Sequence, residues 1–172
     1  AIAREMTPAD QIEADTPAAA PEGPEAQRAK LTDLYAEHFT QGKAIEGIAQ
    51  ARQMARTVVG THVLPGTPLA KVVDEAVEAG AVRAARALLA GIPETDAAAR
   101  YDAMVALYER MPNLNVRTST SVLQQAYSTP LPIALAASRL AGVRLAGTTY
   151  EPSAGNGALL IEAAPGSAIA NE

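Results

Sequence analysis

The sequence predicts a mainly α-helical N-terminal region followed by the start of an α/β sheet of the doubly wound, Rossmann-like type. The 48% hydrophobic content is dominated by Ala, while aromatic residues reach only 3%, and this composition favours helices. Apolar residues recur at the three-and-four spacing of helices as far as Pro112. From Gly142 the pattern changes to short β-compatible segments around a glycine turn, which is typical of the opening of a doubly wound sheet.

The overall composition excludes several classes of protein. The 172 residues contain no Cys, which rules out disulfides, thiol nucleophiles and cysteine-based zinc sites. No apolar run approaches the roughly 18 residues of a membrane span, so we expect no membrane partner and a cytoplasmic location. The net charge of −5 does not favour binding to a phosphate backbone, so a DNA partner would be bound through other regions of a longer parent protein.

Residues 1–24 are predicted to form a disordered linker. The stretch from Met6 to Pro24 consists mainly of Pro, Ala, Glu and Asp, and it has too few large apolar side chains to offset the entropy of ordering. The first residues lack both an initiator Met and the pattern of a signal peptide, so we expect the chain to be part of something longer.

A helical domain is predicted over residues 25–114, and its first two helices run from Pro24 to about His38 and from Lys43 to about Val58. Gly60 and the Pro65-Gly66 pair then end the second helix. The predicted apolar faces are Leu31, Leu34 and Tyr35 on the first helix, and Ile45, Ile48, Met54 and Val58 on the second.

Two further helices complete this domain. Thr67 and Pro68 predict a capped helix start, and the helix runs to Ala90, with Gly80 favouring a break. Thr95 and Asp96 cap a last helix that ends at Pro112. Its predicted apolar side consists of Tyr101, Met104, Val105 and Tyr108. Because His38 and His62 are isolated and the carboxylates are scattered on faces expected to be solvated, no catalytic residue and no metal site is predicted.

The C-terminal segment carries the most informative pattern. We expect strands over Val143–Tyr150 and Ser167–Ala170, with a short helix over Ala158–Ile161 between them. Gly155 and Gly157 would let the chain leave the first strand in a sharp turn that brings a ligand close to the backbone. Two glycines in a loop also occur by chance, and that alternative stays open.

Several kinds of ligand do not fit this turn. A dinucleotide site would place a small residue where Leu160 stands, and no Gly-Lys-Ser or Gly-Lys-Thr follows to cradle phosphates. A nucleoside-type ligand without phosphates remains. Glu172, which follows the second strand, could accept hydrogen bonds from ribose hydroxyl groups, or it could be an ordinary exposed residue.

Two segments resemble motifs of the N6-adenine DNA methyltransferases. Tyr150-Glu151-Pro152-Ser153-Ala154-Gly155-Asn156-Gly157 resembles their motif I, and Gln124-Gln125-Ala126-Tyr127-Ser128-Thr129-Pro130 resembles their motif X, in the expected order. Residues 118–125 and 132–142 also resemble the methylase-like region of large bacterial strawberry-notch-type helicase proteins. By this resemblance, residues 115–172 form the N-terminal part of a methyltransferase-like domain dependent on S-adenosylmethionine.

The resemblance implies S-adenosylmethionine as the cofactor. It places Tyr127 and Thr129 at the methionine end of this cofactor, the Gly155–Gly157 turn beside its amino-acid part and Glu172 at the ribose. Glu151, at the end of the strand, would orient the loop, or the ammonium group through water. The complete set of implied cofactor-binding residues is Tyr127, Thr129, Pro130, Glu151, Pro152, Ser153, Ala154, Gly155, Asn156, Gly157 and Glu172. The Pro-Pro-aromatic element that these enzymes use for the flipped adenine is not found, so we expect the sheet to be truncated and the chain not to be competent alone.

Two functions follow as hypotheses. The first is the S-adenosylmethionine-binding portion of a DNA (adenine-N6) methyltransferase-like protein, with contacts to following domains or a homo-oligomer. The second is a non-catalytic helical interaction or scaffold module of a large plasmid or phage helicase-methylase protein. Cofactor binding separates them, and an enzyme linked to NAD is a minor third alternative.

Removal of Ala1 to Pro24 should leave the thermal transition nearly unchanged, because a linker contributes little to the folded core. Calorimetric melting of the full and shortened chains tests this expectation. A loss of several degrees would contradict the linker interpretation.

Overall fold

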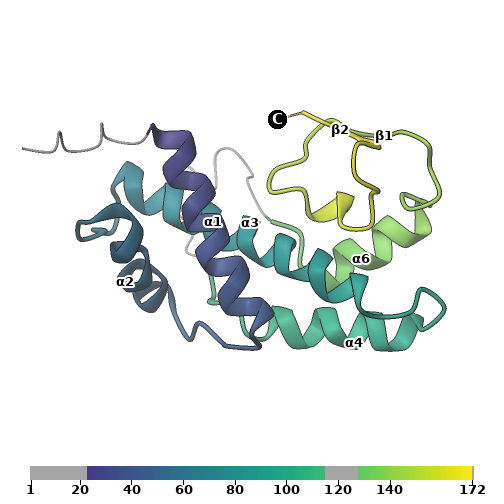
Figure 1. The fold of residues 1–172 in the computed structure, drawn as a ribbon, viewed down its shortest axis with the longest axis horizontal. Coiled ribbons are helices and arrows are strands. Elements are labelled where there is room, and N and C mark those ends of the chain that lie inside the picture. The colour runs from purple at the N-terminus through teal and green to yellow at the C-terminus, as the bar shows by residue number, and fades with distance from the viewer. Residues whose placement is uncertain (1–22, 115–127, 172) are drawn as a thin grey trace, which may run out of the picture.

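A computed structural model describes residues 23–114 and 128–171 and shows a mainly helical protein with one small parallel sheet (Figure 1). The predicted linker thus lies almost wholly outside the described residues. The α-helices are α1 (Pro24–Thr40), α2 (Ile48–Val59), α3 (Pro68–Ala90), α4 (Ala97–Tyr108) and α6 (Leu131–Leu140). The C-terminal part contains strand β1 (Thr149–Glu151), the 3-10 turn η1 (Ala158–Leu160) and strand β2 (Ala168–Ala170).

Helix α1 begins at Pro24, as predicted, and continues two residues beyond His38. Leu31 and Tyr35 are fully buried, which confirms two members of the predicted stripe. The Tyr35 hydroxyl group donates to the Ala51 carbonyl over 2.7 Å and so links α1 to α2. Burial of this tyrosine raises the pKa of its hydroxyl group, so it stays a neutral donor.

The second helix begins later than the sequence indicated. Residues 43–47 form a connection in which the Ile45 amide donates to the Arg110 carbonyl over 2.9 Å, and this bond holds the segment outside the helix. The fully buried residues of α2 are Ala51 and Ala55. The predicted Ile48, Met54 and Val58 are partly buried and pack against the same core, and Ile45 is buried just before the helix, so the predicted face is confirmed in part. Left-handed Gly60, with φ 70°, ends the helix where predicted.

Helix α3 starts as predicted and is not broken at Gly80. The Thr67 hydroxyl oxygen accepts from the Ala70 amide over 3.2 Å, and Pro68 occupies the first turn. Helix α1 crosses α3 (Figure 1), and a Cβ atom at Gly80 would meet the Tyr35 Cβ on α1 at 2.7 Å. The glycine therefore permits close contact between two helices and does not interrupt one.

Helix α4 is capped by the Asp96 carboxylate, which accepts from the Ala99 amide over 2.9 Å. Its buried side is not the predicted one. Tyr101 and Tyr108 are 46% and 40% exposed, whereas Arg100, Met104 and Leu107 are buried. Met104 belongs to both the predicted and the observed buried face, so residue spacing alone could not show which face is buried. The hydrogen bonds of Arg100 favour the face that carries this arginine.

The two strands pair in parallel, with Tyr150 opposite Ile169, which confirms the predicted connection of strand, turn and strand. The elements are shorter than expected: residues 143–148 precede the strand, and the short helix is a single 3-10 turn. Leu131, Leu135 and Ile161 belong to the same apolar core as the helices, so the C-terminal part packs directly on them. Tyr150 and Ile169 remain more than half exposed.

Replacement of Gly80 by Ala should lower the free energy of unfolding by about 1–3 kcal/mol, because the added Cβ forces α1 and α3 apart. Urea titration measures the change. Gly91→Ala is the matched control, since a Cβ there would lie 3.5 Å from its nearest neighbour and meet ordinary contact distances. Equal stabilities of the two variants would show that the helix crossing tolerates a methyl group.

Candidate functional site

The glycine turn joins β1 to η1 through residues 152–157. Gly155 and Gly157 adopt left-handed φ angles of 50° and 79°, which only glycine takes up without strain. A Cβ atom at either position would meet nothing within 4 Å, so the turn borders open space. Pro152 and Ser153 are exposed at its start. The turn can therefore admit a ligand against its backbone.

Most backbone amides of this turn have protein partners among the described residues, and two have none there. The Gly157 amide donates to the Ala154 carbonyl over 2.7 Å, and the Ala154 amide donates to the Asn171 carbonyl over 2.9 Å. The Glu151 carboxylate accepts from the Ser153 amide over 3.2 Å. Within residues 23–114 and 128–171, the amides of Gly155 and Asn156 donate to no protein acceptor, so the tip of the turn offers two neighbouring N–H donors.

One carboxylate from the helical region joins the two segments that resemble methyltransferase motifs. The Asn156 side-chain amide donates to the Glu78 Oε2 atom over 2.7 Å, and the Ser128 hydroxyl group donates to the same oxygen. Ser128 directly precedes Thr129, while Asn156 lies between the two glycines of the turn. Glu78 on α3 thus holds the start of one segment against the tip of the other.

The electrostatic environment of Glu78 is unusual. Burial is the main cause that raises the pKa of its carboxyl group above the ordinary value, and the nearby carboxylates of Glu75 and Asp74 raise it further. The hydrogen bonds from Ser128 and Asn156 lower this pKa in part. In the described chain no arginine or lysine forms an ion pair with Glu78.

The sequence-predicted site residues fall into three groups. Residues 151–157 form the turn itself, and Asn156 is the member that contacts α3. Thr129 and Pro130 directly precede α6, with the Pro130 carbonyl accepting from the Ala134 amide over 2.9 Å, so they also begin a helix. Tyr127 and Glu172 lie outside the described residues.

Arg86 on α3 holds the chain that follows the turn. Its guanidinium group donates to the Leu160 carbonyl over 2.8 Å and to the Ala163 carbonyl over 2.7 Å. Leu160 ends η1, and its carbonyl also accepts from the Ala163 amide over 2.9 Å. The helical region therefore fixes the glycine turn from both sides, through Glu78 before η1 and through Arg86 after it.

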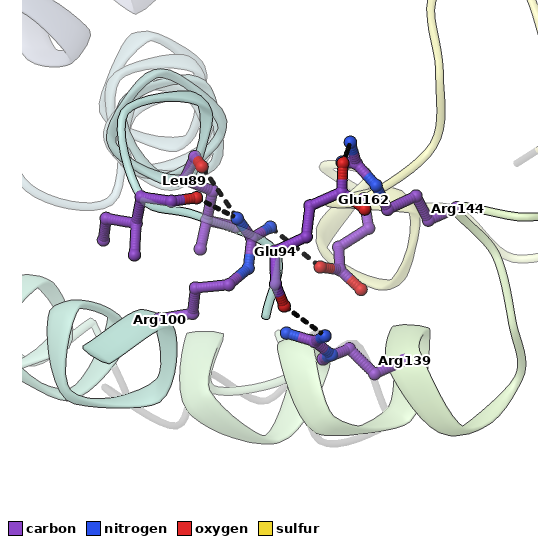
Figure 2. A network of polar contacts seen from close by, with 7 residues as sticks. Leu89, Glu94, Arg100, Arg139, Arg144 and Glu162 are labelled. Atoms are coloured by element: carbon purple, nitrogen blue, oxygen red, sulfur yellow. Dashed lines mark hydrogen bonds and ion pairs between the residues drawn. The ribbon is translucent and has the colours of Figure 1, made fainter. Parts of the chain in front are cut away.

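A second arginine joins three parts of the fold, and Figure 2 shows it between the end of α3 and Glu162. Arg100 on α4 donates to the Leu89 carbonyl over 2.8 Å and to the Ile92 carbonyl over 2.9 Å. It also forms a 2.8 Å ion pair with Glu162, and both side chains are only 2% exposed. Both terminal nitrogens of the guanidinium group thus have protein partners, whereas the buried Nε atom has none among the described residues. We interpret the contact as structural because both charged side chains are buried.

The same region contains a pocket of about 380 Å³, lined by residues 89–94 together with Arg100 and Arg144. Arg144 pairs with the Glu94 carboxylate, and Arg139 donates to the Glu94 carbonyl over 3.0 Å (Figure 2). No residue of the glycine turn lines this pocket. Because its arginines already have carboxylate partners, the pocket offers no unpaired charge for a ligand.

Neither a metal site nor a membrane-spanning helix is found among the described residues. In the part of the chain that the structure describes, no group of three or more His, Asp or Glu side chains could hold a metal ion. Of the described helices, none combines the length and the apolar character needed to cross a membrane.

Comparisons with protein-family models, with curated proteins and with solved structures find no match for this chain.

The sequence contained a partial signal for the residues it did not identify. Arg100 stands four residues before Met104 and seven before Leu107, which is the spacing of a buried helical face. Glu162 ends an apolar run that starts at Ala158. Neither residue was assigned a role from the sequence, and both are buried. Glu78 carried no comparable signal, because its partners lie 50 and 78 residues away.

Replacement of Arg100 by Met should lower the free energy of unfolding by about 3–5 kcal/mol, because it leaves the Glu162 carboxylate buried without a partner. Arg144→Met is the control, since its pair with Glu94 is exposed and is worth about 0–1 kcal/mol. Urea unfolding of both variants gives the comparison. Similar losses for the two would rule out a special contribution from the buried pair.

Proposed function

We propose that this chain binds S-adenosylmethionine at the glycine turn and that it is the cofactor-binding portion of a DNA (adenine-N6) methyltransferase-like protein. The observation that carries the proposal is the meeting of Ser128 and Asn156 at Glu78, since it brings together the two segments that resemble motif X and motif I. In this view β1, η1 and β2 are the start of a Rossmann-like sheet.

The chemistry of the turn suits the amino-acid end of this cofactor. The amides of Gly155 and Asn156, which have no acceptor in the described part of the chain, can donate to a carboxylate. The absence of side chains on the two glycines lets the ligand lie against the backbone. Residues 151–157 include no Lys or Arg, so the turn is unsuited to a diphosphate. Thr129 would contribute from the second segment, and Tyr127 and Glu172 are proposed to complete the site.

Methyl transfer would depend on other regions of a longer protein. No metal site is found among the described residues, and the sequence has no Pro-Pro-aromatic element to hold a flipped adenine. Because the net charge of −5 does not favour contact with a phosphate backbone, we assign DNA binding to other regions as well. The proposed role of this chain is thus to hold the cofactor in the cytoplasm for chemistry completed elsewhere in the protein.

A scaffold module is the second candidate, and one observation favours it. Tyr150 and Ile169 face each other across the two strands and are 62% and 56% exposed. Among the described residues the two strands pair only with each other, and an exposed apolar pair on such a sheet is suited to contact with another surface. A scaffold would use this face and would not need the glycine turn.

Calorimetric titration of the 172-residue chain with S-adenosylmethionine tests the proposal. Gly155→Val should weaken binding at least about tenfold, because the side chain would occupy the space beside the free amides. Gly142→Val is the matched control, since that glycine is also left-handed, with φ 67°, and also borders open space. Both variants should keep the helical circular dichroism signal.

The outcomes separate the two candidates. Binding to the wild-type chain and to the Gly142 variant, but not to the Gly155 variant, supports the cofactor-binding function. No heat of binding with the wild-type chain would sink it and would leave the scaffold. Equal affinities of the two variants would show that any ligand lies away from the turn.

A further inference from the structure

We propose that Glu78, on helix α3, binds the ammonium group at the amino-acid end of the ligand. This inference rests on the proposed function, and it adds a contact that comes from the helical region and not from either methyltransferase-like segment. It thereby assigns the helical region a direct part in ligand binding.

The position of Glu78 supports this role. Its Oε2 atom accepts from Asn156 at the tip of the glycine turn and from Ser128, the neighbour of Thr129. The carboxylate therefore lies where the two segments meet, bound to the side chain of Asn156. The backbone amides of Asn156 and of the preceding Gly155 have no protein acceptor among the described residues. A ligand group bound against the turn would lie beside this carboxylate.

The charges on α3 point to a cation as the missing partner. The Arg52 Nη2 atom donates to both carboxylate oxygens of Asp74, at 2.9 and 3.2 Å. Glu75 lies 3.7 Å from both Arg28 and Lys71. Glu78 is the third carboxylate in this stretch, and its partners among the described residues are neutral donors.

A half-buried carboxylate without a cation is unfavourable, because burial and neighbouring negative charges both oppose its ionised form. A bound ammonium group would relieve this cost through a charge-assisted hydrogen bond. The tip of the turn presents N–H donors and Glu78 presents an acceptor. An amino acid has the complementary pair of groups, with its carboxylate directed to the amides and its ammonium group to Glu78.

The experiment compares Glu78→Gln with Glu75→Gln in calorimetric titrations of the full chain. The first substitution keeps an oxygen acceptor but removes the charge, and the control removes the same charge from a carboxylate of α3 that already has cationic partners. Three ligands are used: S-adenosylmethionine, S-adenosylhomocysteine, which lacks the sulfonium charge, and methylthioadenosine, which lacks the amino-acid end.

Glu78→Gln should weaken both amino-acid ligands by about tenfold or more and leave methylthioadenosine unchanged. Glu75→Gln should change none of the three. The wild-type chain gives an independent check: an analogue with a hydroxyl group in place of the amino group should bind about tenfold more weakly than S-adenosylhomocysteine. This comparison holds even if the Glu78 variant does not fold.

Three results would overturn the inference. Unchanged affinity of the Glu78 variant for S-adenosylmethionine would remove Glu78 from the site while leaving the proposed function intact. Equal losses for all three ligands would give Glu78 a structural role only. No binding of any of these ligands by the wild-type chain would end both the proposed function and this inference.

Discussion

The buried guanidinium group of Arg100 is the contact on which the arrangement of the two parts depends. It satisfies carbonyl groups at the end of α3 and also neutralises Glu162 beyond the glycine turn. A two-stranded parallel sheet of three residues per strand cannot fold by itself, because it buries too little surface. Arg100 and Arg86 therefore attach this small unit to the helices, which supply the core that it lacks.

This attachment explains why a ligand site at the turn would belong to both parts of the chain. The turn provides left-handed glycines and free amides, whereas α3 provides the carboxylate that holds Asn156. Displacement of α3 would shift Glu78 and Arg86 together, since they lie about two turns apart on one helix. The helical region is thus more than a neighbour of the proposed site, because it determines the position of the turn.

The sequence predicted those features that depend on local chemistry. The cap at Thr67, the helix that follows it and the parallel pairing of the two short strands all follow from nearby residues. The buried side of α4 was predicted wrongly, because the choice between its two faces depends on partners of Arg100 that lie in other elements. Glu78 was not identified for the same reason. Cofactor binding at the turn stays a prediction.

The close crossing at Gly80 has a consequence for how the protein tolerates change. The buried face of α3 is formed mainly of small residues, with Ala70, Ala76, Gly80, Ala81, Ala84 and Ala85 among them. Shortening such side chains removes few atoms, so truncation at these positions creates only minor voids. Enlarging them forces two backbones apart. Substitutions on the buried face of this helix should therefore destabilise the protein more when they enlarge a side chain than when they shorten one. A core of Leu and Phe would show the opposite preference.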